Sequence, residues 1–213
     1  MKNLLIKEFR LAMHPAAIIF IFLASMLLIP NYPYFVVMFY TCLGIFFICL
    51  TARENHDIDY TMLLPVRKSD LVSARILMVV LLQLIELAIC VIFAVIRSRL
   101  LGNNEAGMNP NLAFFGYAFI LFGIFNLVFF TQYYKNPDKV GVPFLIACIV
   151  IGILIFAMEA TGFLIPALRT YLKDDPSAFP LQLLVFLIGA ALYLLFTFLT
   201  VRVSRKRFLT LDL

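Results

Sequence analysis

The sequence has few charged residues. Of its 213 residues, 14% are Asp, Glu, Lys or Arg and 64% are hydrophobic, whereas soluble domains carry roughly 25% charged residues. A water-soluble core of this length cannot bury so much apolar surface. Residues 11–52 carry no formal charge, and that length fits two membrane spans of about 20 residues each with a turn between them. The composition therefore predicts an integral membrane protein.

The chain also lacks the sequence patterns of enzymes. It has no GxSxG, HExxH or GxxxxGK(S/T) motif, and its two histidines, His14 and His56, lie far apart in the expected topology. The cysteines form no CxxC pair, which argues against a disulfide framework or a zinc site. All four fall inside apolar runs: Cys42, Cys49, Cys90 and Cys148. We therefore expect no catalytic residue, no metal site and no cofactor in this chain, and no ATP hydrolysis through a phosphate-binding loop.

Apolar runs of membrane-spanning length predict the fold class. We expect an all-α polytopic membrane protein in which the whole chain, 1–213, is a single transmembrane domain with six spans. The spans are expected near residues 16–29, 34–50, 76–96, 112–130, 142–158 and 181–201. Pro30 and Pro33 supply a turn between the first two.

Basic residues predict the orientation, because cytoplasmic loops carry an excess of lysine and arginine. With both termini in the cytoplasm, all but four of the 17 basic residues lie on the cytoplasmic side. The four on the outer side are Arg97, Arg99, Arg169 and Lys173. We therefore expect both termini to be cytoplasmic.

The first 13 residues form an amphipathic pattern. Leu4 and Phe9 alternate with Lys7 and Glu8 in a way that places a helix in the membrane interface, before Pro15 begins the first span. A frayed cytoplasmic tail is the alternative.

Two carboxylates lie inside predicted spans. Glu86 is near the middle of the third, where a charge costs roughly 2.5–3.5 kcal/mol on insertion scales, and Gln83 shares its helical face. Together they mark either a substrate path or a buried hydrogen bond to a group such as Asn126. Glu159 closes the fifth span, where it either pairs with a nearby arginine or is solvated. The candidate substrate-path residues are Gln83, Glu86, Asn126 and Glu159.

A dense group of charged residues, 52–75, separates the second and third spans. Its sequence is ARENHDIDYTMLLPVRKSDLVSAR. Pro65 is expected to end a short helix that lies flat on the membrane, and Ser69 to cap the helix that enters the third span. This segment is longer than a link between two neighbouring spans requires, which favours a surface for another protein. An ordinary cytoplasmic loop is the alternative.

These residues resemble a known family. Glu54, Asn55 and Tyr60, followed by MLLPVRKSDLVSARI from Met62 to Ile76, are similar to the signature after the second span of permease subunits of type-2 ATP-binding-cassette exporters. TQYYKNPDKVGVPF, residues 131–144, is similar to the second cytoplasmic loop of that family. The size and short outer loops resemble those of permeases that export phenol-soluble modulins, which are amphipathic peptide toxins, or that protect against peptide antibiotics.

The resemblance implies a function and a set of partners. The chain would be the transmembrane subunit of an exporter in the bacterial plasma membrane that moves a hydrophobic or amphipathic substrate, a peptide or toxin, outward. A separate ATPase subunit would bind ATP and Mg and hydrolyse the ATP, and two permeases, as a homodimer, would assemble with two ATPases among membrane lipids. We expect no nucleic-acid partner.

The resemblance also assigns roles to two segments. Residues 1–13 would be an interfacial elbow helix, and residues 53–65 would be the coupling helix that docks on the ATPase. The docking residues would be Glu54, His56, Asp57, Ile58, Asp59, Tyr60, Met62 and Leu63. The alternative function is a non-transporting membrane scaffold or an immunity protein that sequesters a toxin.

Overall fold

The chain folds into a bundle of long helices. A computed structural model describes residues 2–101, 104, 107–164 and 178–211, and within these ranges it contains helices and no strand. Five helices are long and apolar enough to cross a membrane, and a bent helix pair near the N-terminus gives a sixth. The expectation of an all-α polytopic membrane protein is confirmed.

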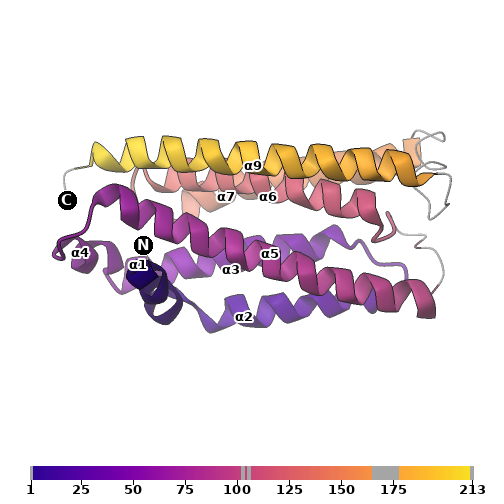
Figure 1. The fold of residues 1–213 in the computed structure, drawn as a ribbon, viewed down its shortest axis with the longest axis horizontal. Helices are drawn as coiled ribbons and strands as arrows, with labels where there is room; N and C mark the ends of the chain where they lie inside the picture. The colour runs from indigo at the N-terminus through magenta and orange to yellow at the C-terminus, as the bar shows by residue number, and fades with distance from the viewer. Residues whose placement is uncertain (1, 102–103, 105–106, 165–177, 212–213) are drawn as a thin grey trace.

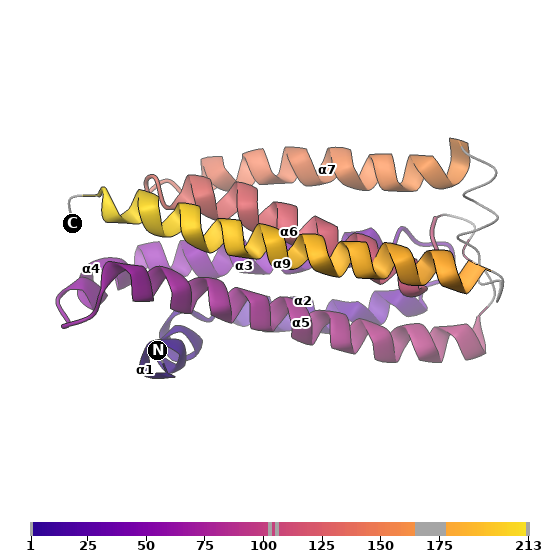
Figure 2. The ribbon, with the colours of Figure 1, turned by 45° about the horizontal axis from the view of Figure 1, so that its top comes forward.

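The long helices run side by side along the bundle (Figure 1; Figure 2). They lie over the ranges expected for the second to sixth spans. Their bounds are α3 Phe35–Glu54, α5 Lys68–Leu100, α6 Leu112–Tyr133, α7 Gly141–Leu164 and α9 Phe179–Leu209. At about 1.5 Å per residue, the 33 residues of α5 extend roughly 50 Å, more than the ~30 Å of the hydrocarbon layer. Both ends of α5 therefore project beyond the apolar core of a bilayer.

The N-terminal segment turns sharply before its own span. Helix α1 (Lys2–Lys7) continues into the π-helical turn η1 (Glu8–Ala12), and α2 (Pro15–Phe22) continues into the 3-10 segment η2 (Leu23–Leu28). The two halves meet at 88°. His14 caps α2 by accepting a hydrogen bond from the Ala16 amide at 3.0 Å, and Pro15 occupies the first helical turn. The first 12 residues therefore run across the bundle rather than along it.

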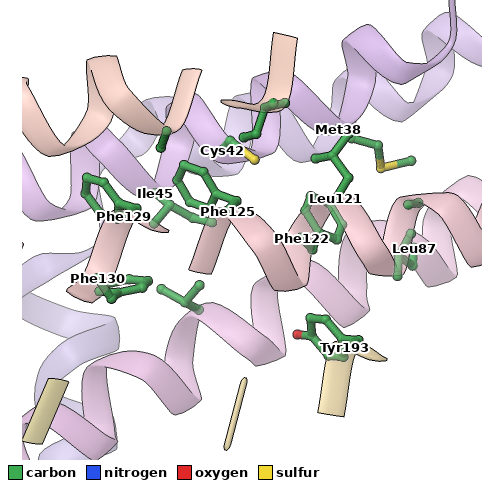
Figure 3. Packing of buried hydrophobic residues seen from close by; sticks show 14 of the residues in the cluster. Met38, Cys42, Ile45, Leu87, Leu121, Phe122, Phe125, Phe129, Phe130 and Tyr193 are labelled. Carbon is green, nitrogen blue, oxygen red and sulfur yellow. The ribbon is translucent and has the colours of Figure 1, made fainter. Parts of the chain in front are cut away.

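Helix α6 occupies the centre of the core. Its phenylalanines pack against side chains from α3, α5 and α9 (Figure 3). The rings of Phe125 and Phe129 stack with centroids 5.2 Å apart. By contrast, large apolar residues on the outer faces of α7 and α9 are exposed, among them Phe156 and Leu194. In a membrane protein such faces contact lipid or another subunit.

Helices α6 and α9 touch along their backbones. Gly116 and Gly189 face each other so closely that a Cβ atom on either glycine would lie within 3 Å of the other helix's backbone. Real Cβ atoms do not approach backbone atoms so closely, so both positions require glycine. Small residues of this kind are typical of helix contacts in membranes, where close van der Waals packing replaces the hydrophobic effect.

Both chain ends lie toward one end of the bundle, together with the short helix α4 (Asp57–Met62) (Figure 1). We call this the basic end, because four basic residues lie there: Lys7, Arg53, Lys68 and Arg205. The loops around residues 29–34 and 107–111 lie at the opposite end. Lys68 Nζ donates to the Leu211 carbonyl at 2.7 Å, and Arg205 Nε donates to Ser73 Oγ at 2.8 Å. The end of α9 is thereby attached to the first turns of α5.

The start of α5 differs from the sequence expectation. The helix begins at Lys68 with Arg67 at the cap position, and no side chain accepts a capping hydrogen bond. Ser69 lies inside the first turn, so the prediction that it caps the helix is wrong. Its hydroxyl donates to Asp70 at 3.5 Å, and Asp70 complements the helix dipole from the first turn.

Candidate functional site

A reversal of the chain after α3 positions α4. The helix α3 ends at Glu54, and His56 adopts the left-handed conformation with φ 47° and ψ 37°. A histidine visits this region at some steric cost, roughly 1–2 kcal/mol, so the surrounding contacts must hold it there. Asp57 follows at the start of α4, and Thr61 Oγ1 donates back to its carbonyl at 2.6 Å. The turn sets one face of α4 against the bundle and the other toward the surface.

The inner face of α4 joins a buried charge cluster, made of Lys7, Glu8, Asp57 and Arg75. Arg75 is 1% exposed and pairs through Nε with Glu8, while a terminal guanidinium nitrogen lies 2.6 Å from Asp57 Oδ2. Lys7 Nζ lies 2.8 Å from Asp57 Oδ1 and 3.0 Å from Glu8 Oε1. Two cations thus balance two carboxylates.

The charge cluster connects three elements that are distant in the sequence. Lys7 and Glu8 come from the N-terminal segment, Asp57 comes from α4, and Arg75 comes from the N-terminal part of α5. Lys7 also donates to Thr61 Oγ1 at 2.9 Å, which adds a second contact to α4. Removing one partner of a buried ion pair costs about 3–5 kcal/mol, because the other charge is left without a partner. The cluster therefore holds α1, α4 and α5 in fixed relation.

Two buried tyrosines at the end of α6 lie near the charge cluster. Tyr133 and Tyr134 are fully buried and their rings meet edge to face, with centroids 5.0 Å apart. Burial raises the pKa of the Tyr134 phenol well above its usual value, so that group stays neutral. In such a buried, low-dielectric environment ion pairs are stronger than in water.

The outer face of α4 is open. Large fractions of the side chains are exposed at His56 (73%), Asp59 (62%), Tyr60 (68%) and Leu63 (81%). His56 Nδ1 lies 3.2 Å from Asp59 Oδ2, which orders part of this face. We call these four residues, with the exposed Glu54, the α4 surface. Exposed tyrosine and leucine side chains among charges are typical of protein interfaces.

A second segment lies beside the α4 surface. Arg53 donates from a terminal nitrogen to the Asp138 carbonyl at 3.4 Å, joining the end of α3 to the link between α6 and α7. A cleft lies between them, lined by Ala52, Arg53, His56, Ile58, Asp59, Tyr133, Pro137 and Asp138. The segment that precedes α7 and the α4 surface therefore form one continuous face at the basic end.

The structure separates the sequence-predicted docking residues into two groups. Glu54, His56, Asp59, Tyr60 and Leu63 are exposed. Asp57 is 7% exposed and Ile58 9% exposed, and both point into the protein, while Met62 is half-buried against the core. The charge cluster was not predicted from the sequence. Its available signal was the position of Arg75, a lone cation immediately before a long apolar run.

The candidate substrate-path residues also separate. Gln83 and Asn126 exchange two hydrogen bonds of 2.9 Å, and Tyr193 donates to Gln83 Oε1 at 2.8 Å. We call these three residues the polar latch, since it connects α5, α6 and α9 in the middle of the bundle. The hydrogen bond to Asn126 was one of the two alternatives offered by the sequence analysis. The bond to Tyr193 was not predicted, because a tyrosine in a span rich in aromatic residues gives no distinguishing signal.

The two candidate carboxylates lie apart from the polar latch. Glu86 is fully buried one turn further along α5; Cys90 Sγ lies 3.7 Å from its Oε1, and its Oε2 has no hydrogen-bond partner among the described residues. Glu159 lies near the opposite end, beside Gly107 and the Met108 backbone. Within the described ranges, neither Arg97 nor Arg99 forms an ion pair with Glu159. Arg169 lies outside the described residues.

Comparisons with known proteins place the chain in a family. No curated protein and no solved structure matches it significantly. Residues 3–208 match the family described as ABC-2 family transporter protein, so the match includes α1, the charge cluster, the α4 surface and the long helices. Members are membrane subunits that work with an ATPase partner. With nearly its full length matched, the chain belongs to the ABC-2 family of transporter proteins.

Proposed function

We propose that this chain is the membrane subunit of an exporter in the bacterial plasma membrane, driven by ATP that a separate ATPase subunit binds with Mg²⁺ and hydrolyses. The basic end would face the cytoplasm, with both termini there, as the distribution of lysine and arginine favours. Residues 53–65 would act as the coupling helix and residues 1–13 as the interfacial elbow.

The observation that carries this proposal is the two-sided character of α4. Its outer face offers Tyr60 and Leu63 to a partner, while its inner face is joined by Asp57 to Arg75 at the start of a membrane-length helix. A push on the α4 surface is therefore transmitted to α5 and, through Glu8, to the N-terminal helix. In this proposal Asp57 transmits force, and the exposed residues do the docking.

The docking role can be tested with one substitution and a matched control. Leu63→Asp places a charge on the α4 surface, whereas Leu209→Asp makes the same change at an exposed leucine at the end of α9. We expect Leu63→Asp to abolish copurification of the ATPase subunit and Leu209→Asp to leave it intact, with both variants inserted in the membrane. Full ATPase recovery and normal transport by Leu63→Asp would overturn the docking role.

The transmission role predicts a different defect. Asp57→Asn keeps the α4 surface unchanged but weakens the contacts to Lys7 and Arg75. We expect the ATPase to copurify with this variant and to hydrolyse ATP, while export falls at least tenfold, which corresponds to a loss of about 1.4 kcal/mol of coupling. Loss of the ATPase instead would show that Asp57 belongs to the docking contact.

For the substrate, we propose a hydrophobic or amphipathic peptide or toxin, carried by two copies of this chain with two ATPases. Support comes from the membership of the ABC-2 transporter family and from the polar latch with Glu86, a group of polar residues within the apolar bundle. Gln83, Glu86, Asn126 and Glu159 would lie along the path, and the latch would have to open for passage.

The path can be tested in cells challenged with an amphipathic peptide toxin. We expect Glu86→Gln to reduce survival and peptide efflux, while Cys90→Ala, one turn away on the same helix, leaves both unchanged. If wild-type cells survive without any ATP-dependent efflux, the chain would act instead as an immunity protein that sequesters the toxin. Survival and efflux of Glu86→Gln equal to wild type would remove Glu86 from the path.

A further inference from the structure

A groove lies between α5 and α6 at the opposite end of the bundle from α4. Its volume is ≈ 280 Å³ and its walls come from the last turns of α5 and the first turns of α6. The lining residues are Val91, Ala94, Val95, Arg97, Ser98, Pro110, Asn111, Leu112 and Phe115. The groove is therefore apolar over most of its length, with one arginine among its walls.

That arginine is buried without a carboxylate. Arg97 is 2% exposed; its Nε donates to Tyr34 Oη at 2.8 Å, and its guanidinium carbon lies 5.2 Å from the centre of the Tyr34 ring. In the ranges that the structure describes, no ion pair involves Arg97. A guanidinium group has five N–H donors, and a buried charge is stable only when it is paired and hydrogen-bonded. Among the described residues, none supplies an anionic group to Arg97.

The order of residues along α5 indicates which kind of anion would fit beside Arg97. Arg97 lies three residues before the helix ends, and Val95 and Val91 lie about 3 Å and 9 Å deeper along the helix, at roughly 1.5 Å per residue. Both valines are about half exposed, at 50% and 46%, so the deeper part of the groove is open toward the surrounding lipid. An arginine at the membrane surface with an apolar groove below it is complementary to a molecule that has an anionic head and an apolar chain.

We propose that this groove binds one anionic phospholipid. The lipid phosphate accepts hydrogen bonds from Arg97, whose planar guanidinium fits phosphate oxygens in pairs. An acyl chain lies along Val91, Ala94 and Val95. Phospholipid is the molecule that would face the open side of the groove, because α5 is longer than the hydrocarbon layer is thick and its last turn would therefore reach the depth of the headgroups. The bound lipid supplies a counter-charge to Arg97, for which the described residues provide none, and fills the groove between α5 and α6.

The experiment compares two neighbouring arginines. Arg97→Gln removes the buried cation, and Arg99→Gln removes an exposed cation two residues away. Purified protein in detergent is titrated with phosphatidylglycerol, with diacylglycerol, which lacks the phosphate, or with inorganic phosphate, and bound molecules are counted by native mass spectrometry. We expect wild type and Arg99→Gln to retain one phosphatidylglycerol, and Arg97→Gln to bind it about tenfold more weakly or worse, the loss expected for one charge-assisted hydrogen bond.

A second variant tests the apolar part while keeping the cation. Ala94→Leu adds bulk to the wall of the groove, and we expect it to reduce phosphatidylglycerol binding although Arg97 is intact. Equal retention by wild type, Arg97→Gln and Ala94→Leu would overturn the site. Diacylglycerol binding as tightly as phosphatidylglycerol would overturn the role of the phosphate, and tight binding of inorganic phosphate alone would overturn the role of the chain.

A second copy of this chain is the competing occupant. Ser98→Cys places a thiol at the exposed rim of the groove. If that variant forms disulfide-linked dimers in membranes in high yield, the groove is an interface between subunits and the lipid site is wrong. We expect no disulfide-linked dimer from this variant, since the pairing of two copies in the proposed exporter would then use another face. Disulfide formation is measured without transport, so failure of the lipid proposal would leave the proposed exporter function in place.

Discussion

Two buried arginines on one helix have opposite surroundings. Arg75 and Arg97 both lie on α5 and are 1% and 2% exposed. Arg75 contacts the carboxylates of Glu8 and Asp57, which come from two other elements. Arg97 contacts the hydroxyl and ring of Tyr34 and, in the described ranges, no carboxylate.

The difference shows two uses of a buried cation. An arginine neutralised by the protein's own carboxylates fixes the relative positions of the elements that carry them. An arginine that meets only a phenol fixes little and retains the capacity to bind an anion from outside. Burial alone does not distinguish these roles, whereas the identity of the contacting groups does.

Among single substitutions, the largest effect on stability is expected for Arg75→Met. The change leaves Glu8 and Asp57 buried with only Lys7 to balance them, so the free energy of unfolding should fall by about 3–5 kcal/mol. Unfolding in mixed micelles with increasing dodecyl sulfate measures this. Arg53→Met, at an arginine whose side chain is 38% exposed, is the control and should change stability by less than about 0.5 kcal/mol. Equal stability of the two variants would contradict a structural role for the charge cluster.

The two carboxylates of the charge cluster should act cooperatively. Glu8→Gln or Asp57→Asn alone leaves Arg75 one carboxylate, whereas the double variant leaves none. The double variant should therefore lose more unfolding free energy than the two single variants together, by about 1 kcal/mol or more. Additive losses, measured by the same micelle unfolding, would show that the two ion pairs are independent.

A smaller loss is expected where Arg97 meets Tyr34. The Tyr34 hydroxyl accepts from Arg97 Nε and donates to the Ile29 carbonyl at 2.8 Å. Tyr34→Phe keeps the ring but leaves both groups without this partner, so it should cost about 1–2 kcal/mol. Micelle unfolding of this variant beside Tyr32→Phe measures the difference. No difference between the two tyrosines would mean that the Tyr34 hydroxyl does not hold Arg97.

The smallest of these effects on stability is expected for Arg97→Met in lipid-free detergent. Methionine has no donor to leave unsatisfied, and no carboxylate among the described residues loses a partner. The cost should stay near or below about 1 kcal/mol, and addition of phosphatidylglycerol should stabilise wild type more than the variant. A loss as large as that of Arg75→Met would show that Arg97 is also paired within the protein.

Much of the fold follows from the sequence because hydrophobic length is a local property. The apolar runs predicted α5, α6, α7 and α9. Pro15 marked the turn before α2, and Pro65 marked the turn after α4. The bend after α1 was expected from the change from an amphipathic to an apolar pattern. The start of α5 was misjudged because a serine near a helix terminus accepts a capping bond only when it precedes the first turn.

The site was less predictable because its contacts are long-range. Glu8 and Arg75 are separated by 67 positions, and no spacing rule connects them. Helix α4 has six residues, too few for a periodic pattern to tell the inward Asp57 from the outward Asp59. The polar latch shows the same limit, since Tyr193 resembles many other aromatic residues of this chain and only the packing of α9 on α6 brings it to Gln83.

The glycine contact between α6 and α9 restricts how this protein changes shape. Where two backbones touch, there are no side chains that can switch rotamers or let the helices slide past each other. Gly116 and Gly189 therefore make the two helices move as a single piece. Any rearrangement of the bundle must take place along seams lined by longer side chains, and the seam between this pair and α5 is held by three hydrogen bonds of the polar latch.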